Sequence, residues 1–220
     1  MIVNPLELLL KYRVLTFEEL SRLSGFSREV LERLVRDHGT ALRVEGELVR
    51  VVNPIDLALR LVQRGMSPTR VSELISWRDF EEFSAEILSK NSYETVTNLL
   101  LTSPVRFQID VLGVDTVTGI ALAVDCKHWS RNTRVALTAA AQRHLERLEK
   151  MRKYRGFVVA RYPIVKRAVE VAGVILTLVR PLFRVYSGSV VLVSISEFNS
   201  FLRDLRAAMD ELGVKPLKLY

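Results

Sequence analysis

The chain has 220 residues and a formal net charge of +7, with 49% hydrophobic and 26% charged residues. This composition is typical of a folded globular protein, with room for one large or two small domains. No apolar run approaches the roughly 20 residues that span a bilayer, and the first residues lack a basic segment followed by a cleavage site. A single cysteine, Cys126, excludes an internal disulfide. We therefore expect a cytoplasmic protein with no membrane segment.

Residues 1–76 predict short helices followed by a β-hairpin. Thr16 and Glu19 have the spacing of a capping box, and apolar residues recur with the helical period in the segment after Ser27. A tight turn at Glu45-Gly46 predicts the hairpin. The expected helices are 5–12, 16–25, 27–39, 54–64 and 67–76, and the expected hairpin is 41–52.

Three short helices followed by a hairpin resemble the winged-helix variant of the helix-turn-helix. The resemblance implies that the third helix enters a major groove of DNA, where Arg28, Arg33 and Arg36 would contact it. A module used for protein contact or dimerisation is the alternative, and the acidic hairpin tip Glu45-Gly46-Glu47 counts against a grip on phosphate. The last two helices would link this small α+β domain (1–76) to the rest of the chain (77–220).

The remainder of the chain predicts a mixed sheet with helices on its faces. A meander of three strands is followed by a strand–helix–strand crossover, which is typical of an α/β domain. The expected helices are 77–90, 134–154, 165–172 and 196–212. The expected strands are 93–101, 107–114, 120–127, 156–160 and 174–179, with further edge strands in 183–193.

Charged residues occur at one end of the hairpin formed by 107–114 and 120–127. If that hairpin is centred at Val117–Thr118, Asp110 lies opposite Asp125, where like charges repel. Side chains alternate along a strand, so Asp125 and Lys127 point to one face and Cys126 to the other. A divalent cation between the two carboxylates would explain their placement; a surface ion pair at a strand end is the alternative.

The residues around this hairpin resemble the PD-(D/E)xK nuclease superfamily, in particular Mrr-type restriction endonucleases and archaeal Holliday-junction resolvases. Phe80-Glu81 followed by Tyr93 is similar to the opening helix of the family, although Ser92 stands where its relatives have glycine. Asp110 resembles the isolated acid of the family, and Asp125-Cys126-Lys127 resembles its acid-x-Lys strand end. The resemblance covers about residues 77–180 and implies a restriction-endonuclease-like fold.

Hydrolysis of a phosphodiester bond fits this set of residues. Asp110, Asp125 and the carbonyl of Cys126 would hold Mg²⁺, or Mn²⁺ in its place, with Glu81 completing the shell. Glu82, one position round the helix, is the less favoured candidate. Lys127 would orient or deprotonate the attacking water. We therefore expect a metal-dependent DNA endonuclease.

The segment 127–167 carries 12 basic residues and two acidic ones, which suggests a polyanionic partner. Arg131 and Arg134 are candidate phosphate contacts, and Gln142 is a candidate polar residue facing the site. Relatives that cut both strands use two active sites, so we also expect a homodimer. The main alternative is a regulator or structural subunit that binds DNA on a nuclease-like scaffold without cutting it, and RNA is a third possible substrate.

Overall fold

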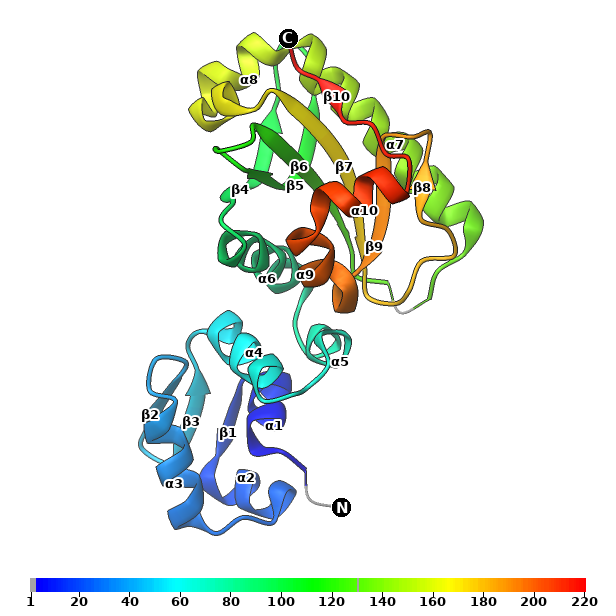
Figure 1. Cartoon of the computed structure of the whole chain (residues 1–220). Coiled ribbons are helices and arrows are strands. Elements are labelled where there is room, and N and C mark those ends of the chain that lie inside the picture. The colour runs from blue at the N-terminus through cyan, green and yellow to red at the C-terminus, as the bar shows by residue number, and fades with distance from the viewer. Residues whose placement is uncertain (1–2, 130) are drawn as a thin grey trace. The chain divides into compact units, whose positions relative to one another are not determined.

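The computed structural model describes residues 3–129 and 131–220. It forms two compact units, Met1–Phe83 and Ser84–Tyr220, each with a sheet of its own (Figure 1). The domain boundary predicted from the sequence, at residues 76–77, lies a few residues earlier in the chain than the division between these units. Among the described residues, no helix combines the length and apolar character that crossing a bilayer requires.

The first unit contains a small antiparallel sheet in the order β1-β3-β2, with helices packed against it. The strand β1 was not predicted, because three residues are too few to show an alternating pattern. Its order along the chain is α1 (Pro5–Tyr12), β1 (Val14–Thr16), α2 (Phe17–Ser24), α3 (Arg28–Asp37), β2 (Leu42–Glu45), β3 (Leu48–Val51), α4 (Pro54–Gln63) and α5 (Pro68–Glu73).

Local sequence signals explain the ends of α2. The backbone N–H of Glu19 donates to Thr16 Oγ1 at 3.1 Å, and the N–H of Thr16 donates to the Glu19 carboxylate at 2.8 Å. This is the predicted capping box, which satisfies backbone donors that the helix itself leaves without partners. The helix stops at Gly25, which adopts a left-handed conformation with φ +77°.

The second unit is built on a larger mixed sheet. The helix α6 (Trp77–Lys90) crosses the boundary between the units. It is followed by β4 (Glu94–Leu101), β5 (Phe107–Val114), β6 (Ile120–Lys127), α7 (Arg134–Lys153), α8 (Arg155–Arg161), the 3₁₀ helix η1 (Pro163–Arg167), β7 (Glu170–Thr177), β8 (Val185–Tyr186), β9 (Val190–Ser194), α9 (Ile195–Arg203), α10 (Leu205–Glu211) and β10 (Leu217–Lys218).

Within the described residues the sheet has seven strands, in the order β4-β5-β6-β7-β9-β8 with β10 beside β7. The strands β4, β5 and β6 form the antiparallel meander, whereas β6, β7 and β9 run parallel. The helix α7 makes the crossover from β6 to β7 and packs on one face (Figure 1). The predicted mixed α/β fold, with a smaller α+β unit before it, is confirmed.

Three predicted elements of this unit were wrong. The apolar run 156–160 is part of the helix α8 rather than a strand; Val158 is buried, but Phe157 is 56% exposed. A short apolar run has no period that separates a strand from a helix. The segment 165–172 is not a helix, because η1 ends at Arg167 and β7 begins at Glu170. The last helix is interrupted at Asp204, giving α9 and α10.

A glycine lets α7 approach the sheet closely. A Cβ atom on Gly173 of β7 would lie 2.9 Å from Leu148 Cδ1 and 3.0 Å from His144 Cδ2, both on α7. Contacts this short would force the helix or the side chains to move. The glycine therefore fixes the position of α7 relative to the ends of β6 and β7, where the candidate site lies.

Candidate active site

The register of the hairpin brings Asp110 and Asp125, the two carboxylates predicted to lie opposite each other, to the same end of β5 and β6. The strands β5 and β6 pair from Val114↔Ala121 to Val111↔Val124, which confirms the expected centre of the hairpin. Asp110 and Asp125 are the next positions beyond the last of these pairs. Asp110 Oδ2 accepts a hydrogen bond of 2.8 Å from the backbone N–H of Cys126. The Asp110 side chain thus connects β5 to β6 beyond the last backbone pair between these strands.

Asp125 is held by two cations. Its side chain is 2% exposed; Lys127 Nζ lies 2.6 Å from Oδ2, and Arg147 Nη1 lies 2.6 Å from Oδ1. The Asp125–Lys127 pair confirms that these two side chains share a face. The side chain of Cys126 points to the other face, where its Sγ lies 3.7 Å from Ser84 Oγ on α6.

Arg147 is a site residue that the sequence did not reveal. It lies on α7, and its guanidinium reaches Asp125 at the end of the sheet. It lies one turn after His144, and His144 and Leu148 both pack against Gly173. The sequence could have identified Arg147 as a basic residue on the sheet-facing side of the crossover helix. That identification requires knowing which face of α7 packs on the sheet.

The two carboxyl groups respond oppositely to this environment. Burial, together with the negative charge of Asp125, raises the pKa of Asp110. Burial also opposes ionisation of Asp125, but the surrounding positive charge and the hydrogen bond from Lys127 outweigh it and lower the pKa of that carboxyl. Asp125 is therefore the carboxylate that the protein keeps ionised, and Asp110 is the one whose charge is costly.

His144 links α7 to β6, the strand that carries Asp125. Its ring is buried, and Nε2 lies 2.8 Å from the carbonyl oxygen of Ala123 on β6, so this nitrogen carries the proton and donates. Burial lowers the pKa of His144, and the negative charge of Asp125 opposes this shift. Lys127 and Arg147 contact the Asp125 carboxylate, while His144 ties α7 to β6.

The oxygen ligands at this site are of the kind that a hard divalent cation prefers, but they are few. Asp110 and Asp125 offer the carboxylate oxygens that Mg²⁺ prefers, and Cys126 can offer only its backbone carbonyl, because its side chain faces away. No group of three or more His, Cys, Asp or Glu side chains suited to a metal occurs in residues 3–129 and 131–220. Glu81 is half-buried on the part of α6 that belongs to the first unit, so its role stays a prediction. Glu82 is exposed and pairs with Arg78.

The predicted nucleic-acid contacts of the second unit lie around the start and outer face of α7. Arg131 and Arg134 are exposed, and the guanidinium of Arg134 lies 5.5 Å from the centre of the Phe183 ring. Gln142 is exposed, and its amide donates to Glu146 at 3.4 Å. These positions are compatible with phosphate contacts, and their role stays a prediction.

The predicted contacts of the first unit differ among themselves. Arg33 and Arg36 are exposed on α3. Arg28 instead donates to both carboxylate oxygens of Glu47 at the hairpin tip, at 2.8 and 2.9 Å, and to Glu32. The acidic tip therefore neutralises the first arginine of the helix.

Comparisons with known proteins leave the family open. No family model matches the chain, and no curated protein matches its sequence. Among solved structures, protein VC1899 from Vibrio cholerae aligns with a TM-score of 0.40 and 11% identity, over 96% of this chain and 52% of that one. The restriction endonuclease FokI aligns with a TM-score of 0.42 and 14% identity, over 93% of this chain and 43% of that one. The chain thus spans about half the length of these two proteins, and likenesses this weak do not establish a family.

Proposed function

We propose that the protein is a metal-dependent DNA endonuclease whose active site is formed by Asp110, Asp125 and Lys127. The observation that carries the proposal is the pairing of β5 with β6. It sets two buried carboxylates side by side at the end of an apolar sheet, with Lys127 in contact with one of them. Such a cluster is costly to bury, so a structural role alone explains it poorly.

Each residue has a role that follows from its surroundings. Mg²⁺, when bound by Asp110 and Asp125, would neutralise charge on the phosphate and lower the pKa of a bound water. Asp125 stays ionised and so is the primary anionic ligand. Lys127 is 11% exposed in its side chain and so can orient a water or neutralise developing charge from a partly desolvated position. Arg147 positions the Asp125 carboxylate.

A second candidate function is a DNA-binding regulator or structural subunit that does not cut. One observation favours it: Lys127 and Arg147 each occupy one oxygen of Asp125, so the carboxylate is already neutralised without a metal. The two functions differ in metal binding. A titration of the full chain with Mg²⁺ and Mn²⁺ by calorimetry gives heat for the nuclease and none for the regulator.

The test of the endonuclease is a cleavage panel of duplex, methylated, branched and single-stranded DNA with Mg²⁺ and Mn²⁺. We expect cleavage by the wild type and at least a 100-fold loss in Lys127→Ala and Asp125→Asn, with DNA binding largely retained. Lys166→Ala, which removes an exposed lysine of η1, is the matched control and should cut normally. Cleavage by Lys127→Ala at the wild-type rate would refute the assignment.

The first unit would contribute DNA affinity or a dimer contact. Its arrangement of three helices followed by a hairpin resembles a winged helix, and exposed Arg33 and Arg36 suit phosphate contacts. Neutralisation of Arg28 by Glu47 favours protein contact instead. Sedimentation of the full chain with and without a DNA duplex separates these roles, because a dimer contact persists when DNA is absent.

A further inference from the structure

Three parallel strands end in one row beside the candidate active site. The register pairs Lys127 of β6 with Thr177 of β7, and Thr177 with Ser194 of β9. Neighbouring strands lie about 4.8 Å apart, so this row extends about 10 Å from Lys127 to Ser194. Ligands of open α/β sheets bind beyond the carboxyl ends of the strands, which makes the row a natural path for a substrate.

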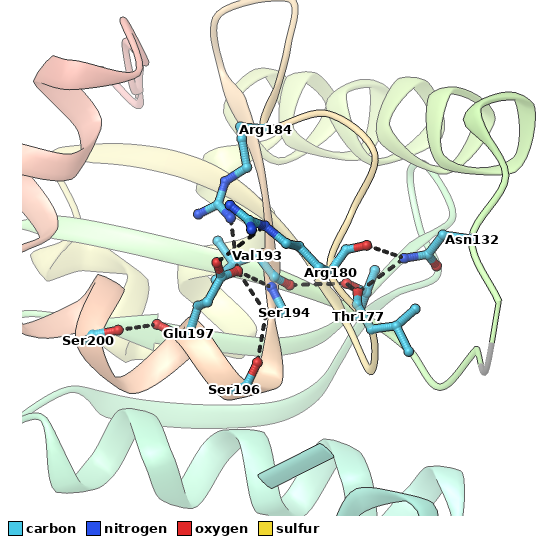
Figure 2. Close-up of polar contacts among 10 residues, drawn as sticks. Asn132, Thr177, Arg180, Arg184, Val193, Ser194, Ser196, Glu197 and Ser200 are labelled. Carbon is cyan, nitrogen blue, oxygen red and sulfur yellow. Dashed lines mark hydrogen bonds and ion pairs between the residues drawn. The ribbon is translucent and has the colours of Figure 1, made fainter. Parts of the chain in front are cut away.

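Two side chains hold the start of the loop that follows β7, residues 178–184 (Figure 2). Thr177 Oγ1 donates to the carbonyl of Val179 at 2.7 Å. Asn132, in the segment after β6, donates through Nδ2 to the carbonyls of Val179 at 3.1 Å and Arg180 at 3.4 Å. These bonds hold the backbone of the loop in place next to the segment that follows Lys127.

The two arginines of this loop are held to different degrees. Glu197 at the start of α9 accepts from Ser194 Oγ at 2.7 Å and from Arg184 Nη1 at 2.8 Å (Figure 2). Arg180 Nε lies 3.9 Å from the same carboxylate, and its side chain is 82% exposed. An exposed ion pair at this distance contributes little, so Arg180 can exchange it for another anion.

The pocket beside these residues limits where such an anion would bind. It has a volume of about 440 Å³ and is lined by Arg180 and Arg184, but also by Glu197, Asp204 and Glu211. Three acids disfavour a phosphate deep inside. The anion therefore belongs at the exposed guanidinium of Arg180, which follows the end of β7 and lies near Glu197 at the start of α9.

We propose that Arg180 binds a backbone phosphate of the DNA strand close to the bond cut at Asp125 and Lys127. Its guanidinium lies at the end of the row far from Lys127, because it pairs weakly with Glu197, which also accepts from Ser194. Asn132 positions the loop that carries Arg180, and Glu197 competes with the phosphate. This inference rests on the proposed function for the location of the cut.

The test compares Arg180→Gln with Arg206→Gln by fluorescence anisotropy on a labelled DNA duplex, in EDTA, over a range of salt. Arg206 is an exposed arginine of α10 that lies near Asp115 and Thr118 of the turn between β5 and β6, so it carries the same charge at the opposite end of the strands from the candidate site. We expect Arg180→Gln to bind several-fold more weakly at low salt. The slope of log K against log salt should become shallower by about 0.9, while Arg206→Gln binds as the wild type does. Equal binding by the two variants would overturn the inference.

A second variant tests the competition. Glu197→Gln keeps the side-chain length and can still cap α9, because glutamine also serves in a capping box. It removes the negative charge next to Arg180, so DNA affinity should rise, and the gain should disappear when Arg180 is also replaced by glutamine. Unchanged or weaker binding by Glu197→Gln would contradict the proposed contact.

The binding and cleavage experiments test the Arg180 contact and the endonuclease activity independently. If Lys127 is needed for cleavage but Arg180→Gln binds DNA as the wild type does, the endonuclease stands and the Arg180 contact is wrong. If no substrate is cut but Arg180→Gln loses DNA affinity, the proposed activity is wrong. The contact with phosphate then holds for a DNA-binding regulator.

Discussion

The two units each contain an arginine paired with a carboxylate, and the pairs have nearly the same length but different surroundings. Arg147 lies 2.6 Å from Asp125 in the second unit, and Arg28 lies 2.8 Å from Glu47 in the first. The side chain of Asp125 is 2% exposed, whereas that of Glu47 is 64% exposed. Distance alone therefore does not rank these interactions; burial does.

The difference explains why one region is a candidate site and the other a surface. A carboxylate taken out of water is costly unless cations compensate it, and the protein supplies two of them to Asp125. Water screens the pair at Glu47, so forming or breaking it changes little. The loss of stability caused by a substitution should therefore increase with the burial of the charged group that it removes.

Removal of the buried carboxylate should have the largest effect. We expect Asp125→Leu to lower the free energy of unfolding by about 3–5 kcal/mol, because Lys127 and Arg147 then face each other without an anion. The measurement is a urea unfolding curve at pH 7. Because the pKa of Asp125 is lowered in the folded protein, its contribution is present above the unfolded value of about 3.9 and is lost as pH falls through the folded value. The deficit of the variant should therefore shrink in acid, and a deficit independent of pH would contradict this origin.

Filling the close approach of α7 should have the next largest effect. Gly173→Ala places a methyl group about 3 Å from His144 and Leu148, and we expect a loss of about 1–3 kcal/mol from overpacking. Because His144 and Arg147 lie on the same helix, DNA cleavage should fall as well. Gly156→Ala is the control: an added Cβ there meets no described atom within 4 Å. A variant of Gly173 as stable as that control would show that α7 tolerates displacement.

Breaking the Arg147 contact should have a smaller effect than losing Asp125. We expect Arg147→Leu to cost about 1–2 kcal/mol, below the range for a fully buried pair, because its side chain is 30% exposed and Lys127 stays with Asp125. Arg143→Leu, at an exposed position of the same helix, should change stability by less than about 0.5 kcal/mol. Thermal unfolding of both variants measures the difference. Equal unfolding temperatures would show that Arg147 does not stabilise the Asp125 carboxylate.

Breaking the exposed pair should have the smallest effect. We expect no measurable change in the unfolding midpoint of Arg28→Gln, since water and salt already screen its contacts with Glu47 and Glu32. Repeating the unfolding curve at low and high salt checks this. A large loss of stability would mean that the two pairs are energetically alike, against the contrast drawn from burial.

Particular residues show how far the sequence predicts the structure. Thr16, Glu19 and Gly25 fix the ends of α2 through contacts within a few residues, so their roles follow from local spacing. The turn at Val117–Thr118 likewise fixes the register that brings Asp110 to Asp125. The run at 156–160 was misassigned because its short apolar pattern is compatible with a strand and with a helix, and packing decides between them.

Two features could be predicted without the structure. The order of helices and strands indicates a mixed α/β domain, and a short turn sets the register that pairs the two carboxylates within one hairpin. Two other features follow from the three-dimensional packing alone: the contact of Arg147 with Asp125, and the hydrogen bonds from Asn132 to the loop that carries Arg180. These contacts join residues 22 and 48 positions apart. They depend on how α7 docks on the sheet and on which strands end together, and no local pattern encodes either.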